Sequence, residues 1–149
     1  MESQLKALAK EIAALIKAHG PPSILLIDDE PMCFKLFSRF MDGCQITWAT
    51  SGEIGLQMLA DAKGEFDVVV VDERLPTIPG TEVIRIIRRD YPTLMTVLST
   101  AYEYDDRNIR DKIKALGPTL PGLGTLFLPK PIQTSDLQAL LAYIDGKNR

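Results

Sequence analysis

Acidic, hydroxyl and amino side chains follow several of the apolar segments in this chain. ILLIDDE contains Asp28 and Asp29, and VVVVDERLP carries Asp72 directly after four valines. Thr100 follows the apolar run LMTVLS, and Lys130 follows TLFLP. Taken singly, each residue is adequately explained as a helix cap, a turn residue or a surface lysine. Their repeated position directly after an apolar run indicates a shared site.

These residue types fit the chemistry of phosphate. Three carboxylates that lie close together repel one another unless a cation neutralises them. A hard ion such as Mg²⁺ suits them, because it binds carboxylates, water and often a phosphate oxygen. A lysine and a hydroxyl beside the ion supply the positive charge and the donor that a phosphoryl group requires. Since a carboxylate can act as a covalent nucleophile, one acid could itself accept the phosphoryl group as an aspartyl phosphate.

The elements that position these residues alternate between strand and helix. The candidate strands are SILLI, QITWAT, DVVVV, LMTVLS and TLFLP. Apolar residues at helical spacing lie between and after them: Cys33, Leu36, Phe37 and Phe40; Met58, Leu59 and Ala62; Val83, Ile86 and Ile87; Ile109, Ile113 and Leu116; Leu137, Leu140, Leu141 and Ile144. Strands without a polar face, separated by helices, predict a parallel sheet covered on both sides. The predicted fold class is doubly wound α/β, in which ligands bind beyond the carboxyl ends of the strands.

Length and composition exclude several classes of protein. A chain of 149 residues with 46% apolar and 25% charged residues fits one globular domain. No apolar run approaches the roughly 20 residues that span a bilayer, so we expect a cytoplasmic protein without membrane insertion. The single histidine, His19, excludes a multi-histidine metal site. Cys33 and Cys44 lack metal-motif spacing, and a net charge of −3 with interspersed signs gives no broad basic face for nucleic acid.

The first 22 residues lie outside this alternation. Their apolar residues have helical spacing, and Gly20 with the two prolines after it ends the helix. We therefore divide the chain into an N-terminal amphipathic helix with a Gly/Pro linker, residues 1–22, and a domain of residues 23–149. The apolar stripe of the helix could bury against the domain, against its twin in a homodimer, or against a partner.

Four motifs together resemble a known family. ILLIDDE, VVVVDERLP, LSTA and LPKP, in this order, resemble the receiver domain of two-component response regulators over residues 23 to about 147. The resemblance implies a flavodoxin-like sheet of strand order 2-1-3-4-5 with helices on both faces. It is compatible with a stand-alone receiver of the chemotaxis type and with part of a larger regulator.

The resemblance implies roles for the acids. Asp72 would be the phosphoacceptor, and Asp28, Asp29 and Asp72 would hold Mg²⁺. Of the adjacent acids Asp28 and Asp29, Asp29 is expected to contact the metal directly. Arg74 would contribute its backbone carbonyl to the metal. Its side chain lies two residues after the acceptor, where it could shield the phosphoryl group and set its lifetime. A solvated loop arginine is an equally good interpretation.

The resemblance also assigns the residues at the ends of the last two strands. Thr100, rather than Ser99, matches the family hydroxyl residue because it directly precedes an alanine. Lys130 would bind the phosphoryl group, and Pro131 would follow a cis peptide bond. Thr100 and Phe127 would form a switch whose two packings shift in population on phosphorylation.

The implied activity is transfer of a phosphoryl group to Asp72 from the phosphohistidine of a sensor histidine kinase or phosphotransfer protein. The chain would be a phosphoacceptor that assists its own phosphorylation and dephosphorylation, and it would signal by protein binding. One alternative is a degenerate receiver that binds proteins without phosphorylation. Another is a haloacid dehalogenase-like phosphotransferase, which places a second acid where this chain has Arg74.

The stretch between Thr100 and Lys130 departs from the family pattern. It is about eight residues longer, most naturally in the loop GPTLPGLG. That loop borders the face between the fourth and fifth helices of the receiver, which, like the N-terminal helix, could form a homodimer or bind a target.

Overall fold

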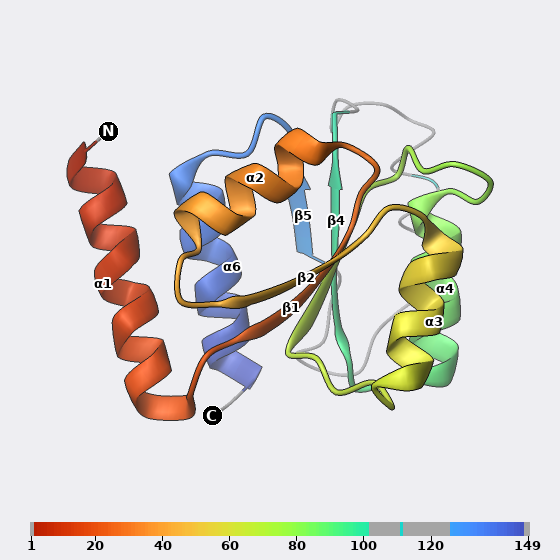
Figure 1. Ribbon diagram of the computed structural model, residues 1–149, viewed down its shortest axis with the longest axis horizontal. Coiled ribbons are helices and arrows are strands. Elements are labelled where there is room, and N and C mark those ends of the chain that lie inside the picture. Colours follow the sequence, from red (N-terminus) through yellow and green to blue (C-terminus); the bar gives the residue numbers. More distant parts are fainter. Residues whose placement is uncertain (1, 102–110, 112–125, 148–149) are drawn as a thin grey trace.

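The strands form a single parallel sheet in a computed structural model that describes residues 2–101, 111 and 126–147. The strand order is β2-β1-β3-β4-β5 (Figure 1). The strands are β1 Ser23–Ile27, β2 Gln45–Ala49, β3 Val68–Val71, β4 Met95–Thr100 and β5 Leu126–Pro129. The helices are α1 Glu2–His19, α2 Pro31–Phe40, α3 Gly52–Asp61, α4 Gly80–Asp90 and α6 Thr134–Lys147. The predicted flavodoxin-like fold and its strand order are confirmed.

Some predictions fall on residues that the structure does not describe. The helix expected through Ile109, Ile113 and Leu116 lies outside the described residues, as does the loop GPTLPGLG. The proposed face between the fourth and fifth helices of the receiver therefore stays a prediction.

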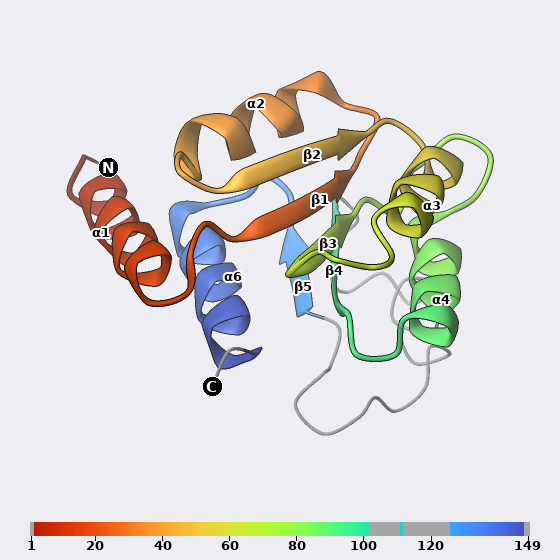
Figure 2. The same ribbon diagram turned by 60° about the horizontal axis from the view of Figure 1, so that its bottom comes forward.

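Helices cover both faces of the sheet. Figures 1 and 2 show α3 and α4 side by side, and α2, α6 and α1 on the other side of the sheet. All four valines of β3 are fully buried. Val68 and Val70 belong to the core beneath α2 and α6, whereas Val69 and Val71 belong to the core beneath α3 and α4. This division follows from the alternation of side chains along a strand and explains why β3 has no polar face.

The strand register brings the carboxyl ends of the central strands level with one another. Ile27 of β1 pairs with Val71 of β3, and Val71 pairs with Leu98 of β4. The residues that follow, Asp28 and Asp72, therefore emerge at the same edge of the sheet.

The N-terminal helix α1 packs on the domain, mainly against α6 and also against α2. Leu8, Ile12 and Leu15 are buried in the same core as the apolar face of α6. Gly20 ends the helix with a φ of +82°, and its N–H donates to the carbonyl of Ile16 at 2.7 Å. The apolar stripe of α1 is therefore buried against the receiver domain itself, which is one of the three surfaces considered from the sequence. Among the described residues, no helix is long and apolar enough to cross a membrane.

Candidate functional site

Lys130 stands among three acidic side chains at the carboxyl edge of the sheet. Its Nζ is 2.8 Å from Oδ2 of Asp28, 3.4 Å from Oδ2 of Asp72 and 3.7 Å from Oε2 of Glu30. Asp28 and Asp72 follow β1 and β3 and are 1% and 2% exposed. The structure therefore brings together residues that lie up to about a hundred positions apart, as predicted from the strand ends. We call Asp28, Asp29, Asp72 and Lys130 the acid–lysine site.

The acids of this site have the composition of a site for a hard cation. Asp28, Asp29 and Asp72 each offer an oxygen atom within 4.8 Å of the others. Oδ1 of Asp72 is buried and has no hydrogen-bond partner. The Asp28 oxygens are engaged, since Oδ1 accepts from the N–H of Glu30 at 2.8 Å and Oδ2 from Lys130. Three carboxylates, one with an unpartnered buried oxygen, fit Mg²⁺, which binds oxygen ligands and retains several waters.

The protonation of the site reflects its burial and its charges. Burial raises the pKa of Asp72 from 3.8 to about 6, the Lys130 ammonium opposes this rise, and the Asp28 carboxylate adds to it. Burial alone lowers the pKa of Lys130, but its hydrogen bond to Asp28 and the charges of both acids raise the pKa above its ordinary value. Lys130 is therefore positively charged at neutral pH, and Asp72 loses its proton only near pH 6.

Thr100 ends β4, and Phe127 lies on β5, three residues before Lys130. Thr100 is fully buried as the last residue of β4, and its carbonyl accepts from the N–H of Lys130 at 2.9 Å. Phe127 is half-buried and packs in the core beneath α3 and α4. The peptide bond between Lys130 and Pro131 is cis, which is the geometry that the family resemblance predicts.

The loop between β3 and α4 is fixed by a residue that the sequence did not single out. Glu73 is 3% exposed, and its Oε1 accepts from the N–H of Thr81 at 2.7 Å, while Thr81 Oγ1 donates to Oε2 at 3.3 Å. It caps α4, whose own N-cap residue, Pro79, provides no side-chain cap. Gly80 is needed here, because a Cβ at this position would lie 2.2 Å from the Asp72 carbonyl oxygen. Arg74, in the same loop, is exposed.

A tryptophan supports the loop that carries the acidic pair. Trp48 Nε1 donates to the backbone carbonyl of Asp28 at 2.6 Å. The indole stacks on Phe34 of α2, with ring centroids 4.8 Å apart and planes at 9°. Sequence patterns place Trp48 on a strand but give no sign of a contact twenty residues away.

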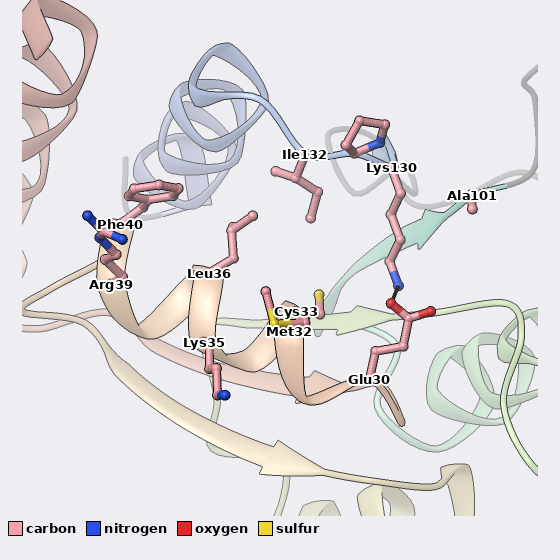
Figure 3. Close-up of a pocket in the computed structure, with 11 residues that line it drawn as sticks. Glu30, Met32, Cys33, Lys35, Leu36, Arg39, Phe40, Ala101, Lys130 and Ile132 are labelled. Atoms are coloured by element: carbon pink, nitrogen blue, oxygen red, sulfur yellow. Dashed lines mark ion pairs between the residues drawn. The ribbon is translucent and has the colours of Figure 1, made fainter. Parts of the chain in front are cut away.

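A groove opens beside Lys130, between α2 and the segment after β5. It has a volume of about 620 Å³ and is lined by Glu30, Met32, Cys33, Lys35, Leu36, Arg39, Phe40, Ala101, Lys130, Pro131 and Ile132 (Figure 3). Figure 3 shows Lys130 reaching toward Glu30 at one end of the groove. Met32 is 70% exposed at its rim. Burial and the neighbouring Asp28 raise the pKa of the Cys33 thiol, so this cysteine is protonated and unreactive.

Comparisons with known proteins agree with this fold. The family model described as response regulator receiver domain matches residues 24–142. The chain is 31% identical over 130 residues to the transcriptional regulatory protein GlrR of Escherichia coli, covering 86% of this chain and 26% of that protein. It is 29% identical over 76 residues to the two-component response regulator ORR24 of rice (Oryza sativa), covering 48% of this chain and 12% of that protein. The solved signal receiver domain of an HD domain-containing protein from Pseudomonas fluorescens Pf-5 is similar with a TM-score of 0.72 and 23% identity, covering 86% of this chain and 90% of that one.

Doubly wound α/β domains bind their ligands at the carboxyl edge of the sheet, which is where the acids and the lysine of this chain lie. The match over residues 24–142 makes the class specific: the chain belongs to the response regulator receiver domain family of two-component systems. It spans less than a third of the length of GlrR or of ORR24.

Proposed function

We propose that this receiver accepts a phosphoryl group on Asp72 in a Mg²⁺-dependent reaction. The observation that supports this most is the placement of Lys130, whose ammonium lies 2.8 Å from Asp28 and 3.4 Å from Asp72 beside the unpartnered Oδ1 of Asp72. A half-buried lysine next to a buried carboxylate provides a nucleophile together with a cation for the transferred oxygens.

Each residue of the site has a distinct task in this proposal. Asp29 and Asp72 would hold the metal directly, Asp28 would support it and anchors Lys130, and Arg74 would add its backbone carbonyl. The ion, when bound, would offset negative charge on the attacking Asp72 carboxylate and on the phosphoryl oxygens. A carboxylate oxygen of Asp72 forms the new bond to phosphorus as the bond to the imidazole nitrogen of a phosphohistidine breaks, and the bonding electron pair stays on that nitrogen.

Lys130 and Thr100 act on the transferred group. Lys130 binds a phosphoryl oxygen through its ammonium, and the Thr100 hydroxyl donates to another. Movement of Thr100 toward the phosphoryl group, with a change in the packing of Phe127, would shift the domain to its signalling state. The Arg74 guanidinium, exposed two residues after the acceptor, would modulate how long that state lasts.

The donor in this proposal is a sensor histidine kinase or a phosphotransfer protein in the cytoplasm. The apolar groove beside Lys130 supports an approach of that partner along α2, because it leads to the acid–lysine site. Residues 1–22 would form an added helix before a receiver domain of residues 23–149, and the output would be a change in protein binding.

Intact-mass measurement tests the proposal. Wild type and Asp72→Asn are incubated with a small-molecule phosphodonor and Mg²⁺. We expect a labile adduct of one phosphoryl group on wild type and no adduct on the variant. When a chelator replaces Mg²⁺ in the incubation, no adduct should form on wild type. No adduct on wild type at any donor concentration would instead support the degenerate receiver.

A further inference from the structure

The strand register places Ser99 next to Asp72 at the carboxyl edge of the sheet. Val71, the last residue of β3, pairs with Leu98 of β4, so Asp72 and Ser99 directly follow a paired position of two neighbouring parallel strands. The residues two positions before each of them belong to the core beneath α2 and α6. Side chains alternate along a strand, so continuing this pattern by one residue past β3 places Asp72 and Ser99 toward that same side.

Both side chains carry a buried polar atom without a hydrogen-bond partner. Ser99 is 1% exposed, and among the described residues the two such side-chain atoms are Ser99 Oγ and Asp72 Oδ1. One is a hydroxyl that can donate, and the other is a carboxylate oxygen that can accept. Neighbouring strands are about 4.8 Å apart, so a change of the Ser99 side chain to another staggered rotamer can bring the hydroxyl to the carboxylate. A buried hydroxyl without a hydrogen-bond partner lowers the stability of the fold. Its presence next to the proposed phosphoacceptor therefore calls for a functional explanation.

We infer that Ser99 is a further catalytic residue of this site, whose hydroxyl donates to the Asp72 carboxyl oxygen that does not bond to phosphorus. The inference rests on the proposed phosphorylation of Asp72. It assigns a second hydroxyl in addition to Thr100, and the two act on different atoms: Thr100 on the phosphoryl group and Ser99 on the carboxyl group that carries it.

The hydrogen bond accelerates dephosphorylation. In this step a water oxygen forms a bond to phosphorus, the bond from phosphorus to the Asp72 oxygen breaks, and its electron pair returns to the carboxylate. The water proton leaves with the phosphate or passes to solvent. Negative charge therefore grows on the carboxyl group, and the Ser99 donor binds the transition state more strongly than the acyl phosphate. In phosphorylation the Asp72 carboxylate begins with its full negative charge and loses part of it as the bond to phosphorus forms. Loss of the Ser99 donor therefore does not slow phosphorylation.

The test compares the two rates in Ser99→Ala with those of wild type. Each protein is phosphorylated with a small-molecule donor and Mg²⁺, the donor is removed, and the intact-mass adduct is followed over time. We expect the half-life of the adduct to lengthen by about ten-fold in Ser99→Ala, with the phosphorylation rate within about two-fold of wild type. Ser99→Thr, which keeps the hydroxyl, should restore a half-life close to that of wild type.

A control on the same strand separates this role from a structural one. Thr96 is also buried in β4 but pairs with Val69, which faces the core beneath α3 and α4. Thr96→Val should leave the half-life unchanged. The urea midpoint of Ser99→Ala should equal or exceed that of wild type, because the variant removes a hydroxyl that has no partner.

Three results would overturn the inference. A half-life of Ser99→Ala within about two-fold of wild type would show that the hydroxyl does not act on the reaction. A parallel fall of both rates together with a lower urea midpoint would mean that Ser99 is structural. Absence of an adduct on wild type would remove the proposed function as well, and this distinguishes its failure from that of Ser99 alone.

Discussion

Asp72→Asn should stabilise the fold at neutral pH when no divalent cation is present. The folded protein raises the pKa of Asp72 from 3.8 to about 6, so the buried carboxylate holds its proton more tightly than the unfolded chain does. Ionising it in the folded state therefore costs free energy, and an asparagine of nearly the same shape avoids that cost.

The size of the effect follows from the shift in pKa. Two units of pKa, at about 1.36 kcal/mol each, correspond to about 3 kcal/mol of unfolding free energy. Because the carboxylate is 2% exposed, solvent screens this energy little. For a chain of this length the difference corresponds to an increase on the order of 10 °C in Tm.

The direction of the pKa shift of Asp72 determines how stability depends on pH. Below the unfolded pKa of 3.8, both states are protonated and the cost is absent. As the pH rises through this value, the unfolded chain loses its proton first, so wild type loses stability until the pH passes about 6. The stability gap between Asp72→Asn and wild type should therefore be largest above pH 7 and about half as large at pH 5.

Urea denaturation in the presence of a chelator, at pH 7.5 and pH 5, measures this gap. Asp42→Asn is the matched control, because Asp42 is exposed, and its effect should stay within about 0.5 kcal/mol. Adding Mg²⁺ should stabilise wild type but not Asp72→Asn and so narrow the gap at pH 7.5. Equal stability of wild type and Asp72→Asn at pH 7.5, or a gap that does not change with pH, would refute the reasoning.

Three other changes test the surroundings of the site. Trp48→Phe keeps the stack on Phe34 but removes the donor to the Asp28 carbonyl, and we expect Mg²⁺ affinity, measured by calorimetry, to fall several-fold; unchanged affinity would contradict a positioning role. Glu73→Ala removes the cap of α4 and should lower the unfolding free energy by about 1–2 kcal/mol, whereas Glu73→Gln, which keeps an acceptor, should lower it less; equal losses would contradict the capping role. Arg74→Ala should change the half-life of the phosphorylated state without changing stability by more than about 0.5 kcal/mol, and identical half-lives would remove its modulating role.

The strands and the position of the acids could be predicted because both follow from short, local sequence patterns. Four valines before Asp72 indicate a strand buried on both faces, and parallel strands necessarily present their carboxyl ends at one edge. This reasoning sufficed to place Asp28, Asp72 and Lys130 together. Helical spacing likewise identified the stripe of α1, but a stripe shows which residues are buried and not which surface covers them.

The supporting contacts could not be predicted because they join distant positions through side-chain geometry. The bond from Trp48 to Asp28 depends on the pairing of β1 with β2, and the Glu73 cap depends on the path of the loop back to Thr81. Ser99 and Thr100 are adjacent in sequence, and a motif match favours one of them without testing the other. Only the strand register shows that Ser99 is the lateral neighbour of Asp72.

Chemical localisation of the phosphoryl group tests the central claim most directly. Borohydride reduction of the phosphorylated protein converts an aspartyl phosphate to homoserine, and tandem mass spectrometry of its peptides locates the converted residue. The site predicts conversion at Asp72 alone, dependent on Mg²⁺ and on Lys130. Conversion at Asp28 or Asp29, or no conversion in a protein that carries the adduct, would contradict it.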